Sequence, residues 1–399
     1  MMQVRDAGTA TLPAPGAEAR AHSQRLVALI RERIRAAGGA LGFADYMNLV
    51  LYAPGLGYYS AGARKFGPAG DFVTAPEVSP LFSRVLARQL GGLLESLDGG
   101  DILELGAGSG AMAAEVLAAL DAAGTLPRRY RILEVSAELR ARQRERIVEQ
   151  VPGLAARVHW LDALPDEPLR GAVVGNEVAD ALPVERFRRE VAGVSRMIVT
   201  ATADGLALDW APAPPALTDA VAALETRLGR RLPPGYVSEL SLGLTGWMSD
   251  VAGVLGEGFL LLADYGFGES EYYAPERGCG TFRCHYRHRA HEDALLWPGL
   301  QDLTAWVDFS ALARAGVAAG LELAGYTTQA HFLIGGGLEA ELAGFESLDE
   351  RGRLSLSAEV KTLTLPGEMG EAFRFIGFSR AGGPPRPPGF ALSDLRRTL

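Results

Sequence analysis

The sequence predicts an α/β fold built on a mostly parallel sheet, and three observations support this prediction. Short apolar runs of strand character alternate with helical periodicities between residues 101 and 175. A glycine-rich turn joins the first of these runs to an alanine-rich helix. At 399 residues with 48% hydrophobic side chains, the chain is large enough to bury such a sheet between helices.

The composition argues against several classes of protein. A formal net charge of −9 disfavours binding of nucleic acid through phosphate contacts. Two cysteines cannot form a disulfide framework, and no apolar run reaches the roughly 18 residues of a membrane span. The N-terminal residues lack the apolar core of a secretory signal. We therefore expect a soluble protein of the cytoplasm, or of the mitochondrial matrix if the source is eukaryotic. The sequence leaves the oligomeric state open, a homodimer being one option.

The residues before the first strand, 21–100, are expected to form a cap. Residues 1–20 mix Pro, Gly, Ala and both charge signs, which is typical of a disordered tail. Apolar residues at helical spacing then predict an amphipathic helix over residues 23–37, with Ser23 as its N-cap.

Two glycine-rich stretches, 52–59 and 67–80, predict loops between that helix and the sheet. Ser79 and Pro80 predict the N-cap and the first residue of a second cap helix. The α/β region then follows in the order strand 101–105, helix 109–123, strand 130–135, helix 137–150, strand 157–161 and strand 171–175.

A further buried strand over residues 258–266, with Asp264 near its end, predicts that the sheet resumes after an interruption. We interpret residues 186–257 as an insertion before this fifth strand, one that walls the substrate side of a single domain spanning 21–380. Within the insertion the patterns predict strands at 187–190 and 197–201 and a helix at 238–255. The Pro-rich tail, 381–399, favours extended geometry.

The turn after the first strand has the composition of a nucleotide site. Its sequence is Glu104-Leu-Gly106-Ala107-Gly108-Ser-Gly110. The glycines permit a sharp reversal and a close approach of the backbone to a ligand, which the N–H groups of the next helix then face. A carboxylate at position 104 would repel a pyrophosphate but could hold an ammonium group. S-adenosylmethionine carries that ammonium and no phosphate, so we favour it as the cofactor.

Two acidic residues after the following strands fit a nucleoside. Glu134 can accept hydrogen bonds from both ribose hydroxyls, and Asp162 can accept one from the adenine amino group. Because NAD and S-adenosylmethionine share these groups, the two residues indicate a nucleoside without naming the cofactor.

The fourth strand ends in Asn176-Glu177-Val-Ala-Asp180, a segment suited to a cationic methyl acceptor. Oxygens of Asn176 and Glu177 can orient an amine or guanidinium beside the cofactor. If the segment opens a helix, Glu177 and Asp180 lie on one face as a paired acidic site. A helix-capping role for Asp180 is the alternative.

Both cysteines and three of the six histidines gather between Cys279 and His291. Their spacing matches no common zinc pattern, so we do not predict a metal. We interpret the segment as a polar loop of the active site, in which a histidine contacts substrate or acts as a base. Trp306 and Phe309, further along, are expected in the core.

Five sequence blocks in this order resemble the MidA-like family of class I methyltransferases, whose mitochondrial members are complex I assembly factors. The blocks lie at 52–59, 70–79, 103–110, 176–183 and 366–370. The resemblance, which covers roughly 23–380, implies a Rossmann-like fold with a seven-stranded, mostly parallel sheet. It also implies S-adenosylmethionine as cofactor and methylation of a protein arginine, in a subunit of the NADH:quinone oxidoreductase.

Carried onto this sequence, the family pattern assigns roles to particular residues. It makes the glycines of the 106–110 turn the cofactor loop and Glu134 the ribose ligand. It places Asn176 and Glu177 beside the transferred methyl, and it closes Thr74 and Glu77 over the cofactor.

Two other functions stay open from the sequence. Because Gly106-x-Gly108-x-x-Ala111 fits the dinucleotide fingerprint, an NAD(P)-dependent oxidoreductase would share the turn and Glu134, although no catalytic Tyr/Lys or His motif accompanies them. A non-catalytic assembly chaperone that only binds S-adenosylmethionine is the second alternative.

Overall fold

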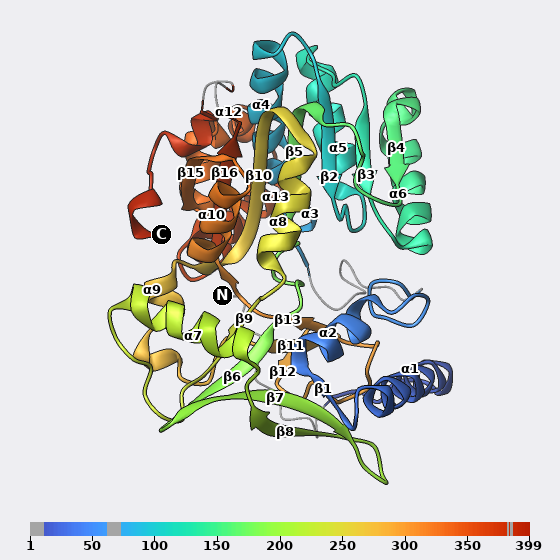
Figure 1. Cartoon of the computed structure of the whole chain (residues 1–399). Helices are drawn as coiled ribbons and strands as arrows, with labels where there is room; N and C mark the ends of the chain where they lie inside the picture. Colours follow the sequence, from blue (N-terminus) through green and yellow to red (C-terminus); the bar gives the residue numbers. More distant parts are fainter. Residues whose placement is uncertain (1–11, 62–72, 381–382, 384–385) are drawn as a thin grey trace.

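The central sheet of the computed structural model, which describes residues 12–61, 73–380, 383 and 386–399, contains eight strands (Figure 1). Seven of them form the order β15-β16-β10-β5-β2-β3-β4, and the short β14 pairs with β10. Along the chain they are β2 (Asp101–Leu105), β3 (Tyr130–Leu133), β4 (Val158–Leu161), β5 (Leu169–Asn176), β10 (Leu255–Phe267), β14 (Val307–Asp308), β15 (Glu322–Thr328) and β16 (Phe373–Ser379). The α/β class is confirmed, with one strand more than the seven predicted.

The directions of the pairs make the sheet mixed. Strands β4, β3, β2, β5 and β10 pair in parallel, whereas β16 runs antiparallel to both β10 and β15. Strand β10 pairs directly with β5, so the sheet does resume after the residues predicted to interrupt it.

Helices cover both faces of this sheet. Successive side chains of a strand point to opposite faces, and here both sets are apolar, so both faces must be buried. Ile102 belongs to the hydrophobic core on one face and the adjacent Leu103 to the core on the other. The helices of the first face include α4 (Pro80–Ser96), α5 (Ala111–Ala123), α6 (Ala137–Gln150), α11 (Gln329–Gly335) and α13 (Glu350–Thr364). Those of the second face are α8 (Leu244–Gly253) and α10 (Phe309–Ala318).

A second lobe lies below the sheet in the view of Figure 1 and combines distant parts of the chain. Its five-stranded sheet contains β1 (Ala40–Gly42), β6 (Glu185–Glu190), β7 (Gly193–Ala201), β8 (Leu206–Pro212) and β9 (Val237–Leu240). A three-stranded sheet contains β11 (Arg283–Tyr286), β12 (Arg289–His291) and β13 (Asp302–Thr304). The lobe also holds α1 (Ala17–Ala36), α2 (Phe43–Tyr52), α7 (Pro215–Leu228) and α9 (Glu269–Tyr272).

One hydrophobic core unites α1, α2, β7 and the three-stranded sheet of this lobe, whereas α7 and α9 pack in a separate core. Leu26 of α1, Phe43 of α2, Val199 of β7 and Phe282 are all fully or almost fully buried in it. Cap and insertion are therefore packed together rather than being independent appendages. We call this assembly the lower lobe. The other α-helices of the described residues are the short α3 (Ala75–Val78), α12 (Leu338–Glu341) and α14 (Met369–Ala372).

The N-terminal boundaries differ from those predicted. Helix α1 begins at Ala17, within the expected tail, because Ala, Glu and Arg at 17–20 are good helix formers. Its N-cap is Gly16, whereas Ser23 is buried inside the helix, so the predicted cap is wrong. The N-cap predicted at Ser79 is confirmed, since its hydroxyl accepts the Leu81 N–H.

Two elements of the insertion also differ. The helix predicted over 238–255 begins only at Leu244, because residues 237–240 pair with β6 as a strand. Helix α7 was not predicted, since the prolines before it indicated a loop. The strand pair predicted at 187–190 and 197–201 is confirmed as β6 and β7.

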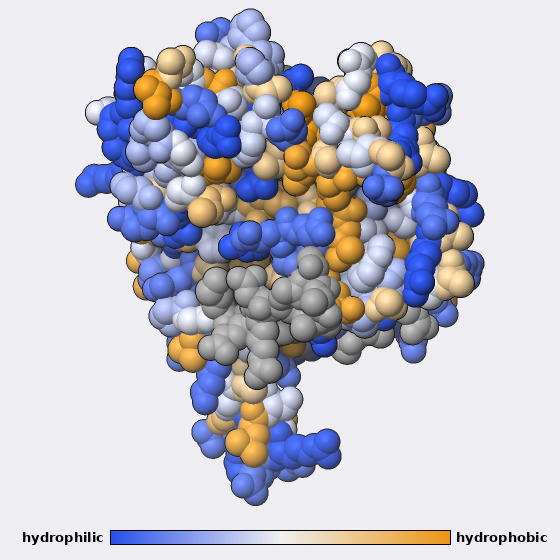
Figure 2. Space-filling model, turned by 90° about the horizontal axis from the view of Figure 1, so that it is seen from below, coloured by the Kyte–Doolittle hydropathy of each residue, from blue (hydrophilic) through white to orange (hydrophobic). Residues whose placement is uncertain are grey.

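The described part of the C-terminal tail packs against the domain. Phe390 is fully buried, with its ring 5.2 Å from that of Phe332 in an edge contact. Seen from below, the surface is mostly hydrophilic, with hydrophobic residues gathered in a band near the middle (Figure 2). Within the described residues, no helix combines the length and apolarity needed to cross a membrane.

Candidate active site

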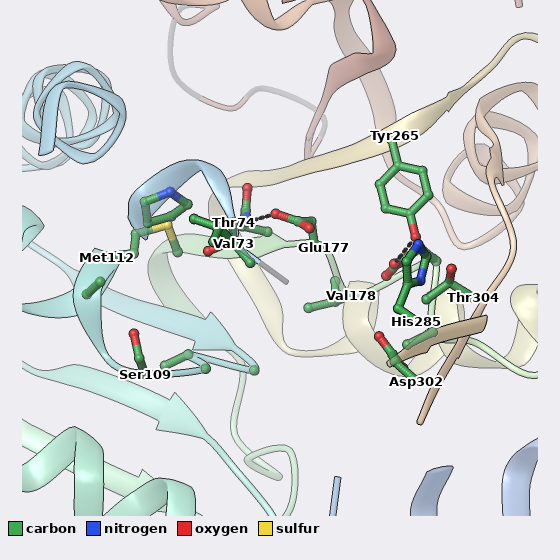
Figure 3. A pocket seen from close by; sticks show the side chains of 18 of the residues that line it. Val73, Thr74, Ser109, Met112, Glu177, Val178, Tyr265, His285, Asp302 and Thr304 are labelled. Carbon is green, nitrogen blue, oxygen red and sulfur yellow. Dashed lines mark hydrogen bonds between the residues drawn. The ribbon is translucent and has the colours of Figure 1, made fainter. Parts of the chain in front are cut away.

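A cavity of about 660 Å³ opens where the sheet meets the lower lobe. Its lining includes residues that follow β2, β3 and β5, together with Tyr265 near the end of β10, at the carboxyl ends where ligands of open α/β sheets bind. Residues of α2, β11 and β13 complete it from the lower lobe. Both parts of the molecule thus contribute to one site (Figure 3).

The glycine-rich turn lies in this cavity where the sequence predicted a cofactor loop. Gly106 and Gly108 have φ of 63° and 54°, a region that side chains disfavour, and both line the cavity with Ala107. Gly110 does not line it. A Cβ there would lie 3.1 Å from Cα of Gln143, so this glycine is needed for close packing of α5 against α6.

Glu104, near the end of β2, lines the cavity together with the glycine-rich turn. Its side chain is buried, and Oε2 accepts a 2.7 Å hydrogen bond from the Tyr130 hydroxyl. Burial raises the pKa of Glu104 to about 7, and the bond from Tyr130 opposes that rise. A cation placed beside it would favour the ionised form.

Glu134 directly follows β3, lines the cavity and is held by its neighbours. One carboxylate oxygen accepts the Ser136 N–H at 2.9 Å, and the other accepts from the Gln143 amide at 3.1 Å. Asp162, by contrast, has a side chain 91% exposed and paired with Arg140, and it is not among the lining residues. The structure therefore gives no support to Asp162 as an adenine ligand.

The segment at Thr74 approaches the same cavity through α3. Thr74 lines it, but Glu77 does not. Glu77 instead accepts hydrogen bonds from the Ser109 hydroxyl and, at 2.9 Å, from Arg146. It ties α3 to the glycine turn rather than facing a ligand. Residues 67–72 of the loop predicted over 67–80, and with them the start of the 70–79 block, lie outside the described residues.

The segment after β5 forms a turn and not the helix that would place Glu177 and Asp180 on one face. Glu177 has φ of 53°, unusual for a residue with a side chain. Asp264 organises the turn, because its Oδ2 accepts the N–H groups of Val178, Ala179 and Asp180 at 2.9 to 3.2 Å. This arrangement still brings Glu177 and Asp180 to the cavity, and it removes the helix-capping alternative for Asp180. We call residues 176–183 the acidic turn.

Both carboxyls of the acidic turn have raised pKa values. Burial and the nearby Asp180 raise the pKa of Glu177 to about 8, against hydrogen bonds from the Asn176 amide and the Ala75 N–H. Burial raises the pKa of Asp180 to about 6, and the hydrogen bond from Tyr265 lowers it. The cavity therefore concentrates carboxyl groups whose ionised forms a cation would stabilise.

The three-stranded sheet contributes a wall that sequence reasoning largely missed. Arg283 pairs with Thr304 and His285 with Asp302 across β11 and β13, and all four residues line the cavity. The intervening Cys284 and Leu303 are buried on the other side. Their alternation in Arg283-Cys-His285 and Asp302-Leu-Thr304 is the signal that could have revealed them.

Histidines of the predicted polar loop do reach the cavity. His285 and His288 line it, and burial lowers the pKa of His285 to about 4. Cys279 is exposed and Cys284 buried. Among the described residues no group of three or more His, Cys, Asp or Glu side chains is placed to hold a metal ion.

Aromatic rings border the acidic side. Tyr52 and Tyr59 stack with ring centres 5.6 Å apart, and Tyr265 meets Trp306 edge to face at 6.1 Å. All four line the cavity, which corrects the expectation that Trp306 belongs to the core alone. Phe309 is fully buried, as predicted.

These features fit S-adenosylmethionine. Gly106 and Gly108 adopt the positive φ that side chains disfavour, Glu104 suits an ammonium, and the held carboxylate of Glu134 suits a ribose. A pyrophosphate would meet the buried Glu104 side chain instead of a cation.

Comparison with known proteins agrees with this geometry. Residues 85–327 match the model of a family described as "Putative S-adenosyl-L-methionine-dependent methyltransferase". A solved structure from Burkholderia thailandensis, described as a "likely methyl transferase" bound to S-adenosyl-homocysteine, is 44% identical with a TM-score of 0.92, over 98% of this chain and all of that one. A second structure from that organism, an uncharacterized protein of the same superfamily, is 43% identical with a TM-score of 0.89 over the same shares.

Curated relatives are more distant. The mitochondrial protein arginine methyltransferase NDUFAF7 of Mus musculus is 28% identical over 376 residues, which span 85% of this chain and 80% of that protein. Its Caenorhabditis elegans homolog is 26% identical over 332 residues, 75% of this chain and 74% of that one. The family match and the S-adenosyl-homocysteine-bound structure lead to one conclusion: the chain belongs to this family of S-adenosylmethionine-dependent methyltransferases.

Proposed function

We propose that this methyltransferase acts on a nitrogen of a protein arginine side chain. The observation that carries the proposal is a pair of buried acceptors in residues that line the cavity. Neither Oδ1 of Asn176 nor Oδ1 of Asp180 has a hydrogen-bond partner among the described residues. A buried acceptor left unpaired costs about 1–3 kcal/mol, so the site favours a ligand rich in donors. A guanidinium offers five N–H donors in one plane and accepts none.

The charge of the site supports a cation as well. The acidic turn and β13 bring Glu177, Asp180 and Asp302 to one cavity. Because burial and mutual repulsion raise the pKa of Glu177, a bound cation would lower that pKa and complete the site electrostatically. The rings of Tyr52, Tyr59, Tyr265 and Trp306 add faces that attract a guanidinium.

The chemistry divides between the two sides of the cavity. Bound S-adenosylmethionine supplies an activated methyl on a positively charged sulfur. On its side, Glu104 would hold the ammonium, Glu134 the ribose and the glycine turn the remaining backbone contacts. On the acceptor side, Asn176 and Glu177 would orient the nitrogen.

The acceptor nitrogen needs a lone pair directed at the methyl. An arginine stays protonated near neutral pH, so carboxylates must localise its charge on the other nitrogens. The transfer forms an N–C bond, breaks the S–C bond and releases one proton. Glu177, whose pKa in the ligand-free site is about 8, is placed to take that proton before it passes to water.

The mitochondrial relatives, which are about 28% identical to this chain, are named as protein arginine methyltransferases, and this name also supports arginine as the acceptor. A subunit of the NADH:quinone oxidoreductase remains the proposed acceptor protein, and the family resemblance alone suggests it. The cytoplasm remains the proposed location.

Transfer of a radiolabelled methyl group tests the proposal. Purified protein is incubated with labelled S-adenosylmethionine and peptides that differ only in Arg or Lys, and hydrolysed products are separated by amino-acid analysis. We expect label on arginine, and a loss of about 10- to 100-fold in turnover for Glu177→Gln with S-adenosyl-homocysteine binding retained. Glu257→Gln is the matched control, because Glu257 is half exposed and does not line the cavity.

Two outcomes would contradict the proposal. Label on lysine or another acceptor would show a different substrate. Cofactor binding without transfer to any peptide or lysate protein would favour the non-catalytic binding protein.

A further inference from the structure

Asp302 enters the cavity from the lower lobe, on a different element from the acidic turn. It lies on β13 opposite His285 of β11, so both side chains project from the same face of the small sheet. In Figure 3, Asp302, His285 and Thr304 gather near the hydroxyl of Tyr265, while Glu177 projects from the strand side.

A tyrosine of the cap holds this carboxylate. The Tyr59 hydroxyl lies 3.0 Å from Oδ1 and 3.1 Å from Oδ2 of Asp302, and it donates to the carboxylate. Tyr59 also stacks on Tyr52. The arrangement parallels the other side of the site, where the Tyr265 hydroxyl donates to Asp180. Two tyrosine-held aspartates therefore line one cavity.

Backbone contacts fix the two aspartates relative to each other. The Ala305 N–H, next to the end of β13, donates to the Asp180 carbonyl at 3.1 Å. The Tyr52 hydroxyl donates to the Ala181 carbonyl at 2.9 Å. The lower lobe is thus bonded directly to the acidic turn, so Asp302 has a set position in the site rather than a mobile one.

We infer that Asp302 is a third acceptor-binding carboxylate, positioned by Tyr59, and that it selects a planar cation. The inference rests on the proposed function. With Glu177 and Asp180 on the sheet side and Asp302 on the lower lobe, carboxylates face the acceptor from two elements. A guanidinium can donate from more than one edge and so engage both sets at once. An ammonium is a compact point charge that cannot span them in one plane.

A purely structural role for Asp302, as the anchor of Tyr59, predicts different behaviour. Asp302→Asn keeps the shape and an oxygen that can accept from Tyr59, but it removes the charge. Tyr59→Phe removes the hydrogen bond and keeps the charge. If Asp302 only anchors the cap, the Asn variant should behave as wild type and the Phe variant should be the more damaged.

Steady-state kinetics on a one-arginine peptide, with peptide binding measured separately, decide between these roles. Binding is followed by tryptophan fluorescence in the presence of S-adenosyl-homocysteine, since Trp306 lines the cavity. We expect Asp302→Asn to raise KM and the peptide Kd by about 10- to 100-fold. Its kcat should change far less, and its affinity for S-adenosyl-homocysteine should match wild type. Tyr59→Phe should show a smaller rise in KM.

Asp293→Asn is the matched control, because Asp293 accepts the Leu295 N–H in the same lobe but does not line the cavity. Failure of the wild type to methylate any arginine peptide would remove the proposed function itself. If the wild type does methylate arginine while Asp302→Asn keeps the wild-type KM and peptide Kd, the role of Asp302 is disproved and the proposed function stands.

Discussion

The hydroxyl of Tyr265 donates a 2.6 Å hydrogen bond to Oδ2 of Asp180, across 85 residues of sequence. Tyr265 lies on β10, the strand that resumes the sheet after the insertion, and the preceding Asp264 accepts three N–H groups of the acidic turn. One strand end therefore sets both the backbone and a carboxylate of the proposed acceptor site.

Removing this hydroxyl should shift the pH dependence of methyl transfer. The Tyr265 bond lowers the pKa of Asp180 against burial, which raises that pKa to about 6. In Tyr265→Phe the pKa should rise further, so a higher pH is needed to ionise Asp180. We expect the acidic limb of the kcat/KM profile to move up by about one pH unit, the equivalent of one hydrogen bond.

Tyr236→Phe provides the comparison, because that hydroxyl bonds the Ala274 carbonyl and does not line the cavity. If the acidic limb of the kcat/KM profile does not move in Tyr265→Phe, while kcat falls by the same factor at every pH, then Tyr265 acts through packing alone.

Cofactor affinity should depend on the ionisation of Glu104. Burial raises its pKa to about 7 in the ligand-free protein, and an ammonium ligand requires the charged form. As the pH falls below 7, a proton must be released on binding, so Kd should rise towards about tenfold per pH unit. Calorimetric titration with S-adenosyl-homocysteine at pH 6, 7 and 8 measures this.

Glu104→Gln should bind more weakly than wild type at pH 8 and lose most of the pH dependence. If Glu104→Gln keeps the full pH dependence of Kd, a titrating group other than Glu104 must cause that dependence.

Glu134 and Asp162 should differ sharply, although both are acidic residues that follow strands. Glu134 lines the cavity with both oxygens held, whereas the Asp162 side chain is 91% exposed. We expect Glu134→Gln to raise the Kd for S-adenosyl-homocysteine by about 10- to 100-fold, because hydrogen bonds to a charged group are lost. Asp162→Asn should leave the Kd within about twofold of wild type. If both variants lose affinity for S-adenosyl-homocysteine equally, Asp162 must also contribute to cofactor binding.

The elements around the glycine turn could be predicted because local pattern and tertiary role agree there. Strand 101–105 and helix 137–150 appear at their predicted bounds, since buried β-formers and helical spacing point the same way. Residues 238–240 show the opposite case. The sequence predicts a helix there, but pairing with β6 outweighs local preference.

The acceptor side was less predictable because it depends on contacts between distant segments. The acidic turn could be located from its sequence, but its form could not, since Asp264 bonds three of its N–H groups from 84 to 86 residues away. Asp302 and Tyr59 are 243 residues apart. No local period indicates such a pair, and only the lower lobe brings them together.

Glu177 should make the ligand-free protein less stable at alkaline pH. Its pKa is about 8 in the folded state, against an ordinary value of 4.5. A carboxyl whose pKa rises on folding stabilises the protein below the ordinary value and loses that contribution as the pH rises through the folded value. Wild type should therefore lose stability between about pH 4.5 and 8, whereas Glu177→Gln carries no charge to bury.

Calorimetric unfolding should give Glu177→Gln a higher Tm than wild type at pH 8 and nearly the same Tm at pH 4.5, with Glu257→Gln close to wild type at both. A variant that unfolds at a lower temperature than wild type at pH 8 would mean that the Glu177 hydrogen bonds from Asn176 and Ala75 outweigh its buried charge. Combined with loss of methyl transfer, the expected gain would identify Glu177 as a residue retained for chemistry at the expense of stability.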